Sequence, residues 1–242
     1  MYEIRLVCEG PTDRELLEGV LRAHLGDADY VMTVLQPDMS LYGGAAGPHG
    51  GGWKGVRGWC RTVASAGGMV AAHAVTPATD LLVIHVDGDV CFDREIGMER
   101  PCPPAQLTIA AVEEVVLGWL GLKCLPDRVV LWIPTMATES WALRALFPEH
   151  PLAVSCRDLP AGSTCVECLP VPSSALIGKT PRLVRRKDGQ IKKLLHEYRT
   201  QQPQISAAWD QLISDLESAD HLKRQLDRWL PAGSRPLPHS AI

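Results

Sequence analysis

The sequence predicts an α/β protein with an open, mainly parallel sheet flanked by helices, and with a helical C-terminal extension. Two short apolar runs, 80–86 and 128–133, have the composition of strands that are buried on both faces, which is typical of parallel sheets. Segments of helical periodicity alternate with them, as parallel crossovers require. No apolar run is long enough to span a bilayer, and the N-terminus lacks a signal-peptide pattern. We therefore expect a soluble, cytoplasmic protein with no membrane partner.

The remaining elements follow from periodicity and turn residues. Residues 2–8 read as a strand that meets a tight turn at Glu9-Gly10, and Thr12 or Asp13 can cap the helix that follows. Thr138 can cap a later helix. The other predicted elements are a strand at 30–36, a glycine-rich loop at 43–52, and helices at 53–66, 105–120, 191–198 and 207–230.

Four regions are predicted along the chain. Residues 1–147 are expected to form an α/β domain. Residues 148–190 are irregular and rich in Pro, Cys and basic side chains, whereas residues 191–230 form the helical extension. Residues 231–242 are expected to be a loose tail.

Charge is unevenly distributed along the chain. The net charge is −4, yet Lys179 to Lys193 holds seven basic residues and one acid. An acidic body with a concentrated basic segment suits a metal site that also holds a polyanion. We expect this segment to be a flexible loop that contacts a nucleic acid backbone through Arg182, Arg185, Arg186 and Lys187. Lys54, Arg57 and Arg61 form a basic helix face that either contacts phosphates or is simply solvated.

Cysteine usage does not suggest a secreted disulfide framework. The chain has eight cysteines, several of them within apolar runs, and a reducing cytoplasm is the simpler interpretation for most of them. Cys165-Val166-Glu167-Cys168 is a single C-x-x-C motif. With Cys156 and His150 it could bind zinc, but the absence of a second such motif favours no metal there.

Acidic residues follow the predicted strands. Glu9 follows the first strand, Asp87-Gly88-Asp89 follows the 80–86 strand, and Glu139 comes shortly after the 128–133 strand. Because ligands bind at the carboxyl ends of parallel strands, these side chains form a candidate cluster. Carboxylate oxygens suit Mg²⁺ or Mn²⁺, which can activate water and stabilise a phosphoryl transition state. His85 is interpreted as a core histidine, although it lies beside the acids.

The order of these motifs resembles the Toprim fold of topoisomerases, primases and overcoming-lysogenization-defect (OLD) nucleases. The resembling residues are Glu9-Gly10-Pro11-Thr12-Asp13, Asp87-Gly88-Asp89 and Glu139-Ser140-Trp141-Ala142-Leu143, within residues 1–146. The resemblance implies that residues 1–147 are a catalytic domain. The spacing between its first two motifs is longer than in the family, so an insertion at 37–75 is assumed. The resemblance implies that Glu9, Asp13, Asp87, Asp89 and Glu139 handle the metals, that Glu9 serves as general acid or base or as a ligand, and that a late lysine such as Lys179 or Lys187 lies near them.

The function implied by this resemblance is metal-dependent hydrolysis of DNA or RNA. Stand-alone proteins of this kind are often encoded beside an ATPase and act against phage, and the chain itself lacks a Walker loop. Two rival interpretations stay open. The first is a haloacid-dehalogenase-like phosphatase or phosphotransferase with Asp87 as nucleophile, and the second is a non-catalytic Toprim-like binding module.

Overall fold

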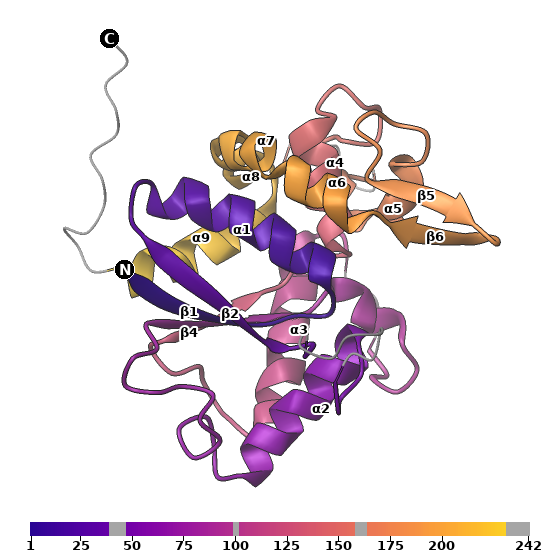
Figure 1. The fold of residues 1–242 in the computed structure, drawn as a ribbon. Coiled ribbons are helices and arrows are strands. Elements are labelled where there is room, and N and C mark those ends of the chain that lie inside the picture. The colour runs from indigo at the N-terminus through magenta and orange to yellow at the C-terminus, as the bar shows by residue number, and fades with distance from the viewer. Residues whose placement is uncertain (39–46, 99–101, 158–163, 231–242) are drawn as a thin grey trace.

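A four-stranded parallel sheet lies between two layers of helices, in a computed structural model that describes residues 1–38, 47–98, 102–157 and 164–230 (Figure 1). Its order is β2-β1-β3-β4, which confirms the predicted fold class. The elements up to residue 146 are β1 (Tyr2–Val7), α1 (Pro11–Leu25), β2 (Tyr30–Gln36), α2 (Gly52–Ser65), β3 (Leu81–His85), the 3₁₀ helix η1 (Gly88–Phe92), α3 (Ala105–Leu120), β4 (Val129–Trp132) and α4 (Thr138–Leu146).

The later elements are short until the final helix. They are the 3₁₀ helix η2 (Val166–Cys168), α5 (Pro172–Ala175), β5 (Val184–Lys187), β6 (Gln190–Lys193), α6 (Leu195–Thr200), α7 (Gln202–Ala207), α8 (Trp209–Asp215) and α9 (Glu217–Trp229). Among the described helices, none combines the length and apolar character that a bilayer span demands.

Alternate residues of the central strands feed two separate cores. Leu81 and Val83 of β3 face the core beneath α1, α4 and α7–α9, whereas Leu82 and Ile84 face the core beneath α2 and α3. All five residues of β3 are buried, as expected for a strand covered on both faces. Helix α2, which lies within the predicted insertion, contributes Val56 to this second core. It is therefore part of the helical layer that covers one face of the sheet.

The strand order creates a switch point between β1 and β3. From β1 the chain crosses through α1 to β2, and from β3 it crosses through α3 to β4 on the other side. The two helices therefore lie on opposite faces (Figure 1). In open sheets of this kind the strand ends diverge at the switch point and leave room for a ligand. Glu9 and Asp87 follow β1 and β3, so both lie at this position.

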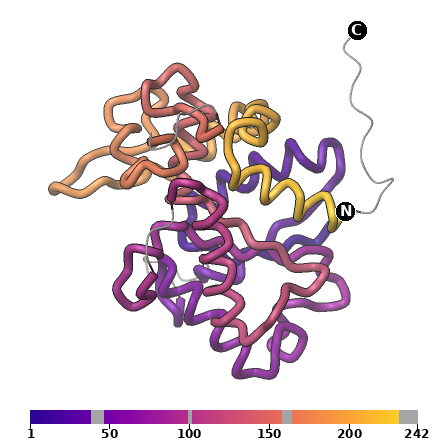
Figure 2. Tube along the Cα trace, turned by 180° about the vertical axis from the view of Figure 1, so that it is seen from behind, coloured from indigo at the N-terminus to yellow at the C-terminus, as the bar shows by residue number. Residues whose placement is uncertain are grey.

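The C-terminal helices belong to the main core. Tyr198, Trp209 and Leu226 are buried in the same cluster as the sheet and α1. Gln225 of α9 closes the outer edge of β4: its Nε2 donates to the Leu131 carbonyl at 2.8 Å, and the Leu131 amide donates to its Oε1 at 2.9 Å. Figure 2 shows α9 in yellow running back across the body of the molecule. The extension thus completes the sheet, because it satisfies backbone groups of an edge strand.

The secondary structure of the basic segment differs from the prediction. Residues 184–193 form an antiparallel hairpin instead of a flexible loop, and 191–193 belong to β6 instead of a helix. Its turn, Asp188-Gly189, has positive φ at both residues (52° and 75°), as a tight two-residue hairpin turn requires. Figures 1 and 2 both show the hairpin projecting from the body of the molecule.

Three further expectations were wrong. The predicted 207–230 helix is broken at the extended residue Leu216 into α8 and α9. Gly10, not Thr12 or Asp13, is the N-cap of α1, and Thr138 is the first residue of α4 instead of its cap. Disulfides join Cys102 to Cys168 and Cys156 to Cys165, while the other four cysteines are free. The predicted tail at 231–242 lies outside the described residues.

The edge contact of Gln225 yields a stability test. We expect Gln225→Ala to lower the free energy of unfolding by roughly 2–4 kcal/mol, because it leaves a buried amide and a buried carbonyl of Leu131 without partners. Urea denaturation followed by circular dichroism measures the change. Gln211→Ala, at an exposed position of α8, is the control and should change stability by less than about 0.5 kcal/mol. Equal effects of the two substitutions would contradict this role.

Candidate metal centre

The acidic side chains at the switch point are linked by short hydrogen bonds. The Asp87 amide donates to Glu9 Oε1 at 2.8 Å, which joins the end of β3 to the end of β1. The Gly10 amide donates to Asp13 Oδ2 at 2.8 Å, so the turn after β1 and the first turn of α1 are fixed to each other. Carboxylates separated by 78 positions in the chain are therefore brought together, as the sequence predicts.

The N-terminus of α4 supplies the second half of the arrangement. The Thr138 amide donates to Asp87 Oδ1 at 3.0 Å, and the Thr138 hydroxyl donates to Asp13 Oδ1 at 3.0 Å. Thr138 thus bridges two carboxylates, one from the first turn of α1 and one that follows β3.

His85 lies behind the carboxylates. Its Nε2 is 3.1 Å from Asp87 Oδ1, and its Nδ1 is 3.6 Å from Asp13 Oδ2. The ring is fully buried and packs against Trp132. Burial lowers the pKa of His85, but the Asp13 and Asp87 carboxylates outweigh this effect and raise it. The predicted core position is correct, and the ring also fixes the orientation of Asp87.

Lys193 is the cation of the site. Its Nζ lies 2.7 Å from Glu139 Oε1 and 4.0 Å from Asp13 Oδ1, and the Tyr198 hydroxyl donates to Glu139 at 3.1 Å. Burial lowers the pKa of Lys193, but Glu139, Asp13 and Asp87 raise it further, so the ammonium stays charged. Burial raises the pKa of Glu139, although Lys193 opposes this effect. Glu139 therefore belongs to an ion pair at the edge of the cluster.

The sequence pointed to a different lysine. Lys179 lies near His150, whose pKa it helps to lower, and it lines another pocket. Lys187 is exposed in β5, and no described ion pair joins either lysine to the carboxylates. Lys193 takes that position because the hairpin returns the chain towards α1 and α4. The Asp188-Gly189 dipeptide between two alternating basic stretches was the available signal, since D-G is a strong hairpin indicator.

Asp89 does not project beside Asp87 as predicted for an extended D-x-D. The chain turns into η1 at Gly88, so Asp87 is buried while Asp89 is exposed. The Gly88 amide donates to the Pro134 carbonyl and the Asp89 amide to the Met136 carbonyl, which holds this turn against the β4–α4 loop. Asp89 still influences the cluster, because it raises the pKa of Glu9.

Like-charge repulsion is visible in the carboxyl groups. Burial, then Asp87 and Asp13, raise the pKa of Glu9 well above its ordinary value. Partial desolvation, then Asp87, raise the pKa of Asp89 to about 7. A divalent cation would relieve this repulsion, because it favours the ionised carboxylates.

The donor set fits a hard divalent cation. Glu9, Asp13, Asp87 and Lys193 line a pocket of about 300 Å³, whereas His85 does not. Ligand atoms of Asp13, His85 and Asp87 lie within 4.8 Å of one another. Carboxylates that face a pocket suit Mg²⁺ or Mn²⁺, and a histidine behind them acts as the orienting partner that such sites commonly have.

The predicted basic helix face is partly neutralised. Lys54 and Arg57 both pair with Glu95, and the Arg57 guanidinium also stacks 4.6 Å from the ring centroid of Trp53. Arg61 is exposed. These contacts favour the interpretation of a solvated, ion-paired surface.

Comparison with family models, with curated proteins and with solved structures returned no match to this chain.

The turn at Gly88 gives a direct test of the site architecture. A Cβ at Gly88 would lie 2.0 Å from the Thr135 carbonyl oxygen. We expect Gly88→Ala to destabilise the fold by roughly 2–4 kcal/mol, because backbone must move to relieve the clash. Gly118→Ala is the matched control: no atom lies within 4 Å of the added Cβ in α3, so we expect a gain of about 0.4–1 kcal/mol. Chemical denaturation of both variants measures the difference, and a loss at Gly118 or none at Gly88 would contradict the packing.

The raised pKa of Asp89 predicts a pH dependence of stability. A carboxyl whose folded pKa is raised from 3.8 to about 7 favours the protonated form in the fold. Its contribution to stability is complete below about pH 4 and is lost as pH rises to about 7. We expect the melting temperature of the chelator-treated protein to fall over this interval, and Asp89→Asn to reduce the fall. Scanning calorimetry at constant ionic strength measures it.

Saturating Mg²⁺ should also reduce the fall in the native protein, because bound cation offsets the repulsion. Asp210→Asn, at an exposed position of α8, should leave the profile unchanged. Identical profiles for Asp89→Asn and the native protein would contradict the assigned electrostatics.

Proposed function

We propose that this protein is a Toprim-like, metal-dependent nuclease that hydrolyses phosphodiester bonds in DNA or RNA. The observation that carries the proposal is the pocket at the β1–β3 switch point, lined by Glu9, Asp13 and Asp87 with Lys193 beside them. Three carboxylates and one cation around a single opening suit a site for a metal ion and a phosphate group.

Bound Mg²⁺ or Mn²⁺ would supply an activated water and neutralise charge on the phosphate. The protein groups have separate tasks. Asp87 is held in place by the Thr138 amide and His85, which prepares it as a ligand. Lys193 keeps a positive charge at the pocket wall, where it can pair with a phosphate oxygen. Glu9, with its raised pKa, can bind metal as a carboxylate or donate a proton to the leaving oxygen.

Binding of the nucleic acid backbone is assigned to the hairpin and its surroundings. Arg185, Arg186 and Lys187 are exposed, and no described ion pair engages them. A second pocket, of about 390 Å³, is lined by Lys179, Arg182, Arg185 and Arg186. Strand β6 of the same hairpin ends at Lys193, which lines the acidic pocket. A polyanion bound to the exposed basic side chains of the hairpin would therefore lie on the element that also reaches the candidate metal site.

The wider setting follows from the resemblance. An ATPase partner, a role against phage and a cytoplasmic location all belong to the proposal. The substrate could be DNA or RNA, because a basic hairpin binds phosphate without distinguishing the sugar.

A cleavage assay tests the reaction. Purified full-length protein is incubated with plasmid DNA and with structured RNA, in Mg²⁺, Mn²⁺ or chelator. We expect cleavage only with metal, and a loss of at least about 100-fold in Asp87→Asn and Asp13→Asn, because each removes a charged ligand without changing side-chain size. Asp210→Asn is the matched control and should keep full activity.

The same variants separate the rival functions. Metal-dependent release of phosphate from small phosphomonoesters, with trapping of an acyl-phosphate on Asp87, would support the phosphatase alternative. Nucleic acid binding that is indifferent to Mg²⁺ and to Asp87→Asn, without cleavage, would support a binding module. A cleavage activity that survives Asp87→Asn would overturn the nuclease proposal.

A further inference from the structure

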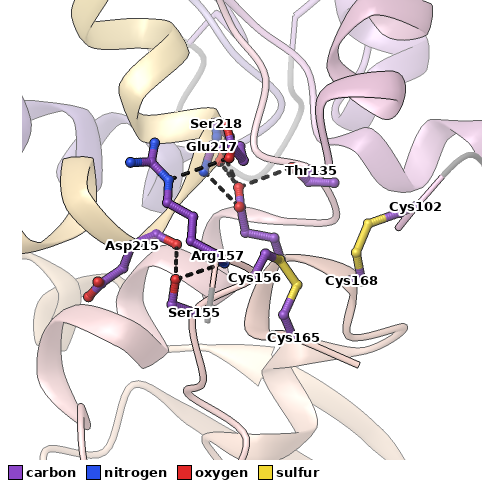
Figure 3. Close-up of a disulfide and its surroundings, with 11 residues drawn as sticks. Cys102, Thr135, Ser155, Cys156, Arg157, Cys165, Cys168, Asp215, Glu217 and Ser218 are labelled. Atoms are coloured by element: carbon purple, nitrogen blue, oxygen red, sulfur yellow. Dashed lines mark hydrogen bonds and ion pairs between the residues drawn. A yellow bond between two sulfur atoms is a disulfide. The ribbon is translucent and has the colours of Figure 1, made fainter. Parts of the chain in front are cut away.

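Four cysteine sulfurs from three stretches of chain converge beside the start of α3. Cys102 precedes α3, Cys156 lies in the segment after α4, Cys165 is the N-cap of η2, and Cys168 is the last residue of η2. Figure 3 shows the two resulting disulfides next to each other. The Sγ atoms of Cys156, Cys165 and Cys168 lie within 4.8 Å of one another, and Cys168 is bonded to Cys102.

Three of these sulfurs have the proximity that a tetrahedral thiolate site requires, and the fourth, on Cys102, is bonded to one of them. Four sulfurs at about 2.3 Å from a zinc ion lie roughly 3.8 Å from one another. Two independent disulfides can stabilise a fold from anywhere in it, and nothing obliges them to be neighbours. The Cys165-x-x-Cys168 pair has the short spacing typical of zinc sites, and the Cys168 amide donates to the Cys165 carbonyl to close the turn.

We propose that the reduced protein binds one zinc ion through Cys102, Cys156, Cys165 and Cys168. A dithiol reductant converts each disulfide to two thiols with two electrons and two protons, and is itself oxidised to a disulfide. The four thiols lose their protons to solvent as Zn²⁺ binds. We assign Cys102 as the fourth ligand because its sulfur is bonded to that of Cys168. His150 is not assigned, because its Nδ1 accepts a hydrogen bond from the Leu152 amide.

The surroundings of the four cysteines favour zinc binding by their thiolates over permanent disulfide bonds. Cys102, Cys165 and Cys168 are each at most 8% exposed, so a bound ion would be shielded from solvent. The start of the 16-residue helix α3 follows Cys102 by three positions and favours thiolate charge there. The remaining cysteines are free thiols, and one of them, Cys124, is exposed. An exposed free thiol fits a reducing compartment, where disulfides rarely persist.

The site would fix a connection between distant parts of the fold. Glu167 lies between Cys165 and Cys168, is fully buried, and accepts hydrogen bonds from the Glu217 and Ser218 amides at the start of α9. It also accepts one from the Thr135 hydroxyl, in the loop that packs on Gly88. Zinc would thus hold the residue that joins α9 to the loop behind the acidic pocket. This role is structural and separate from the proposed nuclease site.

Metal analysis of the full-length protein tests the inference. Protein is purified with reductant, supplied with zinc, freed of excess metal and measured by plasma mass spectrometry. We expect about one zinc ion per chain, lost in Cys102→Ser and in Cys165→Ser. Three controls should keep it: Cys124→Ser for a thiol elsewhere, His150→Ala for the excluded ligand, and Asp87→Asn for the acidic site.

Cobalt provides a readout that does not depend on the variants folding. Co²⁺ added to the reduced wild-type protein should give the intense thiolate-to-metal charge-transfer bands of a tetrahedral sulfur site, and equimolar Zn²⁺ should remove them. Carboxylate ligands give no such bands. Reduced wild-type protein that binds no zinc and shows no charge-transfer bands would overturn the proposal. So would zinc that is retained by folded Cys102→Ser and Cys165→Ser but lost by Asp87→Asn.

Discussion

The mutual repulsion of buried carboxylates at the β1–β3 switch point is the constraint on which the site depends. Glu9, Asp13 and Asp87 are held within one pocket by backbone amides, by Thr138 and by His85, and Lys193 brings an opposing full charge from the hairpin. Desolvation, followed by the charge of Asp87, raises the pKa values of Glu9 and Asp89. A fold can hold such a cluster when many surrounding contacts fix the positions of the carboxylates. Ionisable groups with perturbed pKa values are concentrated at functional sites.

The parts that sequence reasoning recovered are those in which local pattern and global fold agree. β3 and β4 were predictable because their continuous apolar runs are too short for a buried helix and too apolar for a surface loop, and α3 begins and ends at the predicted residues. Convergence of Glu9 and Asp87 followed from parallel topology alone, since both stand after strands that end at one edge. These inferences required no knowledge of any tertiary contact.

The parts that it missed are decided by partners far away in the chain. Leu216 breaks the last helical stretch because Glu167, from another segment, caps the amides that follow it. Asp89 turns outward because its amide bonds the Met136 carbonyl. Lys193 reaches the carboxylates only through the return of the hairpin, and Cys102 meets the other cysteines across 66 positions. Periodicity and spacing carry no record of such pairings, and so they pointed to Lys179 or Lys187 and did not group Cys102 with the other cysteines.

The closure of β4 by α9 has a consequence for the nascent chain. Leu131 leaves the ribosome 94 residues before Gln225, its partner. At about 5–20 residues per second, the outer side of that strand lacks its cover for roughly 5–20 s during synthesis. An uncovered strand edge can pair with other chains. Slow or stalled translation between these two positions should therefore favour aggregation of unfinished molecules, even though the finished protein leaves this edge closed.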